Sequence, residues 1–204
     1  MIAIIDYGLG NVKAFLNVYK RLNIVASVAR TSSELNSASK LILPGVGSFD
    51  CAMELLRQSG MRDALDELVL GRSIPVLGVC VGMQILASSS EEGQLDGLGW
   101  IDGQVRKFDV AAFRQPAPLP HMGWNDVWPV ANSGIFGGLE NDARFYFLHS
   151  YFFQCKQNEH VIAQADYGAA FTCAVKMKNI YGVQFHPEKS HDYGARLLKN
   201  FAEL

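Results

Sequence analysis

One short segment restricts the possible fold more than any other. Residues 78–82 read Gly-Val-Cys-Val-Gly and directly follow the apolar run 74–77. A cysteine between two glycines after a buried strand is typical of a nucleophile elbow, a sharp turn from strand to helix that is strained at its central residue. Small residues two positions before and after it allow the two segments to pass closely. The pattern predicts an α/β sheet with Cys80 facing a cleft and a helix over 81–87.

Cys80 lies at the start of that helix, where free backbone amides and the helix dipole favour a thiolate. The other three cysteines, Cys51, Cys155 and Cys173, have neither a C-x-x-C spacing nor a pattern typical of disulfides or zinc. We expect these three to be small core residues. For Cys80 a buried structural thiol is the alternative, and a nearby base would favour the nucleophile.

A candidate base follows a second apolar strand, over 180–185. His186, Pro187 and Glu188 come next, and residues at the carboxyl end of a parallel strand face the crevice where such sheets bind ligands. His186 would take the thiol proton and return it to a leaving amine, while Glu188 would orient the imidazole. His-Pro-Glu alone is more typical of a capped surface turn. Together with Cys80, it predicts a Cys-His-Glu acyl-transfer site.

Acyl transfer also requires hydrogen-bond donors for the developing oxyanion. The buried strand 41–43 ends in the glycine loop 44–47. We expect the amides of Gly47 and Val81 to be the donors, the second because it directly follows the nucleophile. A Gly-x-Gly pair alone is weak evidence. No metal is expected, because His186 and Glu188 lack companion ligands at chelating spacing.

Five segments carry a family resemblance over the whole chain. They are 44–49 (Pro-Gly-Val-Gly-Ser-Phe), 78–84 (Gly-Val-Cys-Val-Gly-Met-Gln), 120–125 (Pro-His-Met-Gly-Trp-Asn), 149–151 (His-Ser-Tyr) and 184–190 (Gln-Phe-His-Pro-Glu-Lys-Ser). In this order they resemble the class I (triad) glutamine amidotransferases. The block 120–125 is similar in particular to the glutaminase subunits of imidazole glycerol phosphate synthases, from histidine biosynthesis. The resemblance implies one domain over 1–204, with a three-layer, mostly parallel sheet flanked by helices and added antiparallel strands.

The resemblance implies glutamine hydrolysis through a glutamyl thioester on Cys80, with His186 and Glu188 completing the triad and no cofactor. It also implies a set of substrate-binding residues: Gly47 and Val81 at the oxyanion, and Gln84, Ser150, Tyr151 and, as a looser match, Glu92 around the amino acid moiety of glutamine. An amino acid needs acceptors for its ammonium group and donors for its carboxylate, so polar residues on separate loops fit this role. The alternatives are that Gln84 caps its helix and that Ser150 satisfies a strand end.

A partner is implied as well. In this family ammonia passes through a tunnel to a TIM-barrel cyclase subunit of a heterodimer. The positions that match partner-facing residues are Asn11, Trp124, Tyr146 and Lys189. A partly buried structural role is equally open for Trp124, and His121 is expected to be structural. Partner and ligand activate the family's glutaminases, and we expect loop 44–47 to be the element that changes.

Two departures from the family pattern concern the acceptor of the ammonia. Asp50 follows Phe49 where the histidine-pathway subunits usually have glycine, and residues 190–194 (Ser-His-Asp-Tyr-Gly) are unusual after the triad. Both are similar to paralogues found beside surface-glycan genes, which supply a sugar amidotransferase, and this is the alternative function. A stand-alone cysteine peptidase or γ-glutamyl hydrolase leaves blocks 120–125 and 184–190 unexplained. A non-catalytic binding module is disfavoured because the whole triad is present.

Composition is consistent with an enzyme built on one core. The chain has 204 residues, 49% of them hydrophobic, and 18 basic against 20 acidic residues with no basic run. Nucleic acid is therefore an unexpected partner. No apolar run approaches the roughly 18 residues of a membrane helix, and Asp6 comes too early for a signal peptide. With unpaired cysteines, these features predict a cytoplasmic protein without membrane contact.

The first ninety residues alternate between strands and helices, which predicts a parallel sheet covered on both faces. The expected strands are 2–5, 24–28, 41–43 and 75–79, and the expected helices are 12–22 and 49–70. After a polar loop over 88–93, which should border the cleft, shorter strands are expected to extend the sheet, some antiparallel. These lie around Val105 and Trp124 and over 145–152, 161–165 and 171–177. Residues 116–120 should be extended, and 196–204 should form a closing amphipathic helix.

Overall fold

The computed structural model describes residues 1–130 and 134–204. Its main element is an eight-stranded sheet in the order β2-β1-β3-β4-β13-β12-β11-β8. Five neighbouring strands are parallel, namely β2 (Ala26–Ala29), β1 (Ile2–Ile5), β3 (Lys40–Gly45), β4 (Val76–Cys80) and β13 (Ile180–Val183). Three strands continue it in antiparallel pairing, namely β12 (Ala170–Met177), β11 (Val161–Asp166) and β8 (Trp128–Pro129).

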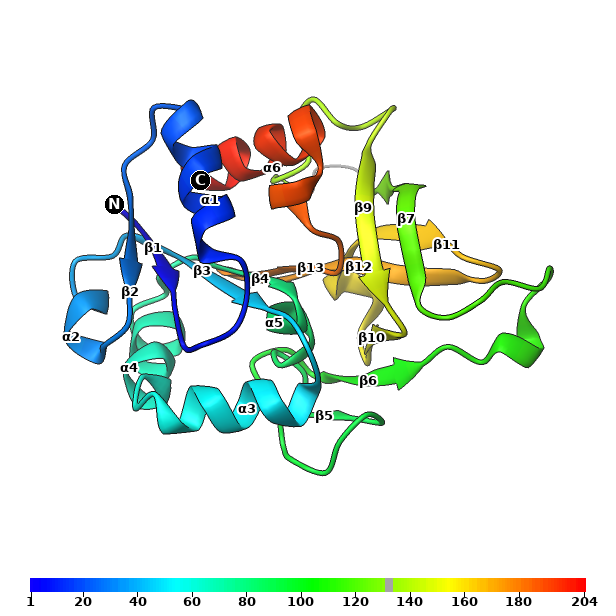
Figure 1. The fold of residues 1–204 in the computed structure, drawn as a ribbon, viewed down its shortest axis with the longest axis horizontal. Coiled ribbons are helices and arrows are strands. Elements are labelled where there is room, and N and C mark those ends of the chain that lie inside the picture. Colours follow the sequence, from blue (N-terminus) through cyan, green and yellow to red (C-terminus); the bar gives the residue numbers. More distant parts are fainter. Residues whose placement is uncertain (131–133) are drawn as a thin grey trace.

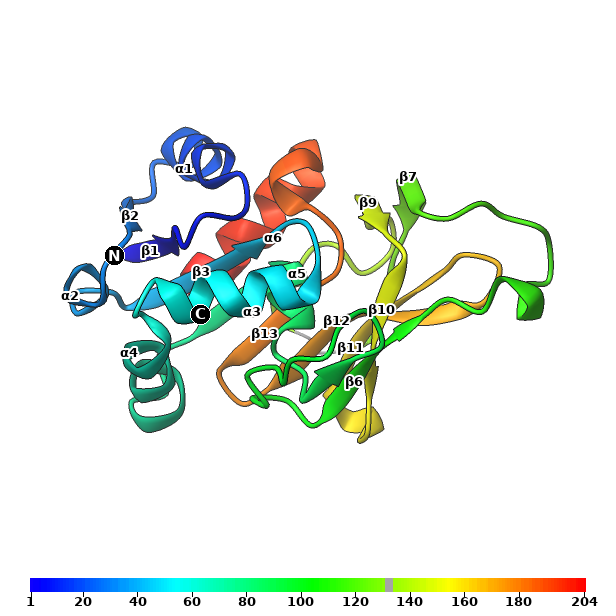
Figure 2. The ribbon, with the colours of Figure 1, turned by 60° about the horizontal axis from the view of Figure 1, so that its bottom comes forward.

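Helices cover both faces of this sheet. Figures 1 and 2 show α1 (Val12–Arg21) and α6 (His191–Glu203) on one face, and α3 (Phe49–Gln58), α4 (Arg62–Asp66) and α5 (Val81–Gln84) on the other. The remaining helical segments are short: α2 (Ser32–Leu35), the π-helical η1 (Glu67–Gly71), and the 3-10 helices η2 (Val110–Ala112), η3 (Asn158–His160) and η4 (Pro187–Lys189). The predicted three-layer architecture, mostly parallel with antiparallel additions, is confirmed.

The central strands are buried on both sides, as expected for a sheet between two helical layers. Every residue of β1 and β4 is buried, which explains their continuous apolar sequences. The helices are instead amphipathic: α1 buries Phe15, Val18 and Tyr19 against the sheet and exposes its basic residues. The predicted alternation of strands and helices in the first ninety residues is therefore confirmed in outline.

Three predicted helix boundaries are wrong. The helix expected over 49–70 breaks after Gln58, because the Ser59 hydroxyl donates to the Leu56 carbonyl and Gly60 adopts a φ of +68°. The elbow helix ends at Gln84 and not at residue 87. The closing helix starts at His191, five residues earlier than its apolar pattern indicated. Residues 116–120 belong to no helix or strand, as expected.

Five of the shorter strands lie outside the main sheet. A three-stranded sheet contains β10 (Tyr151–Cys155), β6 (Gly103–Lys107) and β5 (Ser89–Ser90), and a separate pair contains β7 (His121–Asp126) and β9 (Arg144–His149). Four of the five, β6, β7, β9 and β10, were expected to extend the main sheet. The strand expected over 145–152 is divided at Ser150. There the His149 imidazole Nδ1 donates to the Tyr151 carbonyl at 2.8 Å, which fixes a bend that sends β9 and β10 into different sheets.

Of the three cysteines expected in the core, only Cys173 is fully buried. Cys155 is half-buried, and Cys51 is exposed because it lies on the solvent side of α3, whose buried residues are Phe49, Ala52, Met53 and Leu56. Among residues 1–130 and 134–204, no helix is both long enough and apolar enough to cross a membrane.

Candidate active site

The nucleophile elbow is present at the junction of β4 and α5. Cys80 ends the strand with φ +55° and ψ −116°, a conformation that is strained for any residue with a side chain. A side chain on Gly78 would collide with the Gly82 carbonyl, and one on Gly82 would collide with the Leu43 carbonyl of the neighbouring strand. Both glycines are therefore required by close packing, as the sequence indicated, and the turn directs Cys80 toward a pocket.

His186 and Glu188 form a buried pair after β13. The imidazole Nδ1 donates to Glu188 Oε1 at 2.8 Å, which leaves Nε2 as the ring nitrogen available to Cys80. Burial alone lowers the pKa of His186, but its interactions with Cys80 and Glu188 outweigh burial and raise that pKa to about 10. The raised pKa therefore favours a protonated His186 imidazolium beside Cys80. Within the described residues, Glu188 Oε2 is buried without a hydrogen-bond partner, so its charge is directed to the imidazole.

A pocket of about 280 Å³ opens over the elbow. The residues predicted at the substrate site all line it, namely Gly47, Cys80, Val81, Gln84, Glu92, Ser150, Tyr151 and His186, whereas Glu188 lies behind His186. The lining also includes Val46, Pro120, Leu148, His149 and Lys189. Of these, His149 was not predicted to face the site, although it stands beside Ser150 and Tyr151 in one of the recognised segments.

The glycine loop after β3 forms one wall of the pocket. The Tyr7 hydroxyl donates to the Pro44 carbonyl at 2.8 Å, and burial raises the pKa of Tyr7 well above its usual range, so it stays protonated. Apart from Gly47 and its chain neighbours, no atom of the described residues lies within 4 Å of the place where a side chain on Gly47 would begin, so this face of the loop is open. The loop is anchored at Pro44 and accessible at Gly47, as a substrate oxygen would require.

Gln84 makes contacts across the pocket and does not cap its helix. Its Nε2 donates to the Tyr151 carbonyl at 3.3 Å and to Gln184 Oε1 at 3.0 Å. The same Tyr151 carbonyl accepts the hydrogen bond from His149. The side chain therefore ties α5 to the bend at Ser150. Glu92 Oε2 accepts from the backbone amide of Phe49 at 2.8 Å, which joins the turn after β5 to the start of α3 beside the pocket.

His121 is buried, and its partners give it a structural role. Its Nδ1 lies 2.9 Å from His149 Nε2, and its ring stacks between Phe147 and Tyr167. Because His149 Nδ1 donates to a carbonyl, its Nε2 accepts, and His121 must donate from Nδ1. Burial lowers the pKa of His121 to about 4, so the ring is neutral at physiological pH. His121 supports the pocket through His149.

The full length of the chain matches known relatives. The model of the family "Glutamine amidotransferase class-I" matches residues 3–204. The imidazole glycerol phosphate synthase subunit HisH of Bdellovibrio bacteriovorus is 60% identical over 204 residues, covering 100% of both chains. The HisH subunit of Leptospira interrogans is 55% identical with the same coverage.

Solved structures share the fold at lower identity. A crystal structure of a glutamine amidotransferase superposes with a TM-score of 0.76 and 22% identity, covering 100% of this chain and 99% of the other. PurLQS from Thermotoga maritima gives a TM-score of 0.75 at 14% identity, covering 99% of this chain and 97% of the other. The family match and the close relatives, joined to a buried cysteine, histidine and glutamate at one pocket, identify the chain as a class I glutamine amidotransferase of the HisH family.

Proposed function

We propose that this protein is the glutaminase subunit of an imidazole glycerol phosphate synthase. It hydrolyses glutamine at Cys80 and passes the ammonia to a TIM-barrel cyclase subunit in a cytoplasmic heterodimer. The observation that carries the proposal is the strained, pocket-facing Cys80 beside the buried His186–Glu188 pair. The likeness to HisH subunits over the full chain supports the choice of pathway.

In the acylation step, the Cys80 thiolate attacks the side-chain carbonyl carbon of glutamine and forms a carbon–sulfur bond. The oxyanion that develops is stabilised by the Val81 amide and the Gly47 loop. The His186 imidazolium then donates its proton to the amide nitrogen, the carbon–nitrogen bond breaks, and ammonia leaves. Glu188 holds the imidazole in the required orientation through the hydrogen bond to Nδ1.

Deacylation uses the same groups in reverse roles. Neutral His186 takes a proton from water, the resulting hydroxide attacks the thioester carbon, and the carbon–sulfur bond breaks to give glutamate and the Cys80 thiolate. We assign Gln84, Ser150 and Tyr151 to the amino acid moiety of glutamine, because they line the pocket from two different elements. Glu92 is the acidic group on that wall and suits the ammonium of the substrate.

The partner would dock on the face of β7 and β9 beside the pocket. Cross-strand pairs place Trp124 opposite Tyr146 and Met122 opposite Leu148, and Leu148 itself lines the pocket. Trp124 is 40% exposed and stacks on His191 at 5.5 Å, so it is both packed and available to a partner. An exposed apolar strip that continues into a pocket is typical of an interface. Lys189 lies 5.9 Å from the Tyr146 ring centre, at the edge of this face.

The unusual Asp50 has a structural explanation in this chain. Its carboxylate accepts hydrogen bonds from the amides of Gln94 and Leu95, with distances of 2.9 to 3.2 Å. It therefore fixes the loop that carries Glu92 to the pocket. A residue that stabilises this loop gives no reason to prefer a different acceptor of ammonia, so the histidine-pathway assignment stands ahead of the sugar amidotransferase alternative.

The decisive test mixes the chain with a cyclase subunit of the histidine pathway and its aminoimidazole ribonucleotide substrate. Glutamate release and glutamine-dependent formation of imidazole glycerol phosphate are both measured. We expect coupled turnover that disappears in Cys80→Ala and persists in Cys51→Ala, because Cys51 is exposed and outside the pocket. Glutamate release without imidazole glycerol phosphate would reject the pathway and favour a sugar amidotransferase. Turnover that survives in Cys80→Ala would reject the mechanism.

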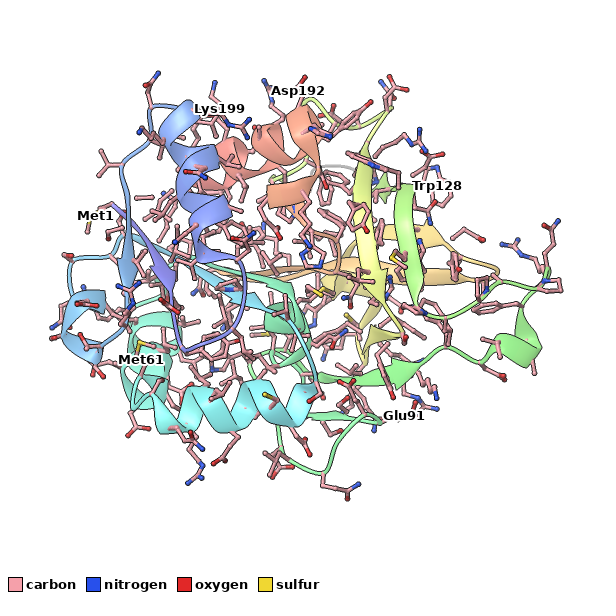
Figure 3. The ribbon with its side chains drawn as sticks, in the orientation of Figure 1. Met1, Met61, Glu91, Trp128, Asp192 and Lys199 are labelled. Carbon is pink, nitrogen blue, oxygen red and sulfur yellow. The ribbon has the colours of Figure 1, made fainter. Side chains whose placement is uncertain are left out.

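The docking face is tested by binding of the same cyclase. Trp124→Ala should weaken the complex at least about tenfold, the scale of a truncated aromatic anchor. Trp128→Ala is the matched control, because Trp128 is 56% exposed but belongs to β8 and not to the face beside the pocket. Figure 3 shows Trp128 in the half of the molecule away from Met1. Equal losses in the two variants would contradict the proposed face.

A further inference from the structure

Gln184 makes a contact with the nucleophile that the triad does not explain. Its side chain is fully buried, and its Nε2 lies 3.7 Å from Cys80 Sγ, within the range of a hydrogen bond to sulfur. The strand register accounts for this proximity. In the parallel pairing of β13 with β4, Val183 lies opposite Val79, so the next residue along each strand brings Gln184 beside Cys80.

The orientation of the Gln184 carboxamide follows from its neighbours. The Tyr151 carbonyl is only an acceptor, so the Gln84 atom facing it must be the nitrogen Nε2. That same nitrogen lies 3.0 Å from the other carboxamide, which must therefore present its oxygen. With Oε1 of Gln184 occupied in this way, its NH2 group is left to point at the sulfur. The network permits only a donor toward Cys80.

We propose that Gln184 is a further catalytic residue of this glutaminase, a buried amide that donates to the Cys80 sulfur and stabilises the thiolate before attack. The proposal rests on the proposed role of Cys80 as the nucleophile. A hydrogen bond to an ionised acceptor is stronger than one to a neutral thiol, so the contact favours the reactive form. The residue also joins the nucleophile to Gln84, and through it to the substrate wall at Tyr151.

Other charged or titratable groups also act on the Cys80 sulfur, and the test must separate them. His186 interacts with it directly, and Tyr7 interacts with it electrostatically from the turn after β1. Glu92, His149 and Lys189 line the same pocket. None of these five groups is changed by a substitution at Gln184. A shift in the titration of Cys80 between variants therefore reports the effect of the Gln184 amide on the sulfur.

The test measures alkylation of Cys80 by iodoacetamide against pH, without glutamine, for wild type, Gln184→Glu and Gln184→Met. The glutamate keeps an oxygen for Gln84 but places a carboxylate oxygen at the sulfur, and the methionine removes both polar groups at nearly constant volume. We expect the midpoint of the alkylation profile to rise by about one unit in the methionine variant and further in the glutamate variant. At pH values below the midpoint, that corresponds to alkylation about tenfold slower or more. Gln154→Met, an exposed residue of β10, is the matched control and should leave the profile unchanged.

Two outcomes would overturn the proposal. If the alkylation profile against pH were unchanged in both folded Gln184 variants, the Gln184 amide would not stabilise the thiolate. A shift in Gln184→Met without one in Gln184→Glu would mean that Gln184 only holds Gln84. Wild type supplies a test that depends on no variant: the side-chain amide NMR signal of Gln184 should titrate with the midpoint of Cys80 alkylation, and a constant signal would also reject the contact. Alkylation needs no glutaminase activity, so this test and that of the proposed function fail independently.

Discussion

Mild acid should destabilise this protein through its buried histidine pair. His121 and His149 are neutral in the folded chain, because burial lowers their pKa values to about 4 and about 3. An unfolded histidine has a pKa of about 6.5. Between these values the unfolded chain binds protons that the folded chain does not, so the free energy of unfolding falls as the pH falls below about 6.5.

The expected loss can be worked out for each ring. One pH unit over which only the unfolded form is protonated costs about 1.4 kcal/mol per histidine. Between about pH 7 and about pH 5 this gives about 2 kcal/mol for each ring, or about 4 kcal/mol for the pair. The effect of His186 on the free energy of unfolding has the opposite sign, because the pKa of His186 is raised to about 10. Its stabilising contribution is fully present below about pH 6.5 and is lost as the pH rises toward 10.

The perturbation that isolates one ring is His121→Asn. Asparagine places an amide donor near the position of Nδ1, so the hydrogen bond to His149 is retained while the titration is removed. Between about pH 7 and about pH 5, we expect the free energy of unfolding of the variant to fall by about 2 kcal/mol less than that of wild type, because only His149 of the buried pair still titrates. Urea unfolding at the two pH values measures the difference. Carboxylates common to both proteins cancel in it.

His191→Asn is the control, because His191 lies at the exposed start of α6. Between the two pH values, the free energy of unfolding of His191→Asn should fall by as much as that of wild type. If His121→Asn loses as much stability on acidification as wild type does, the buried pair is not the source of acid sensitivity.

Three other substitutions test separate parts of the site. Tyr7→Phe leaves the Pro44 carbonyl without its donor and should lower the free energy of unfolding by about 1–3 kcal/mol in urea titrations; an unchanged value would show that the bond is dispensable. Glu188→Gln removes the charge behind His186 and should reduce kcat about a hundredfold or more in glutamate-release assays, whereas near wild-type turnover would contradict an orienting role. Asp50→Ala removes the acceptor of two loop amides and should cost about 1–2 kcal/mol, while Asp50→Asn, which keeps one acceptor oxygen, should cost less; equal losses would refute the capping role.

The parts of the site that the sequence predicted well are those fixed by local backbone geometry. Gly78 and Gly82 predict a close crossing of strand and helix, and the structure shows the collisions that any larger residue would cause. His186 follows a buried strand, and the end of a parallel strand can lie only at one edge of the sheet. Local pattern and global position therefore agree at these residues.

What the sequence could not predict depends on contacts between distant segments. The bend at Ser150 comes from a side-chain hydrogen bond between His149 and Tyr151, which the alternation of apolar residues does not encode. The contact of Gln184 with Cys80 follows only once the register of two strands is known. Cys51 was expected in the core because the cysteines lack a disulfide or metal-binding pattern, yet the rotation of α3 places it outside. The single-domain organisation over 1–204 remains a prediction.

The most direct test of the central claim is to detect the covalent intermediate. The chain is mixed with the cyclase subunit and glutamine, quenched in acid during turnover, digested, and analysed by mass spectrometry. We expect one glutamyl group on the peptide that contains Cys80 and none on the peptides of Cys51, Cys155 and Cys173. Steady glutamate release with no adduct on Cys80, or with an adduct on another cysteine, would contradict this claim.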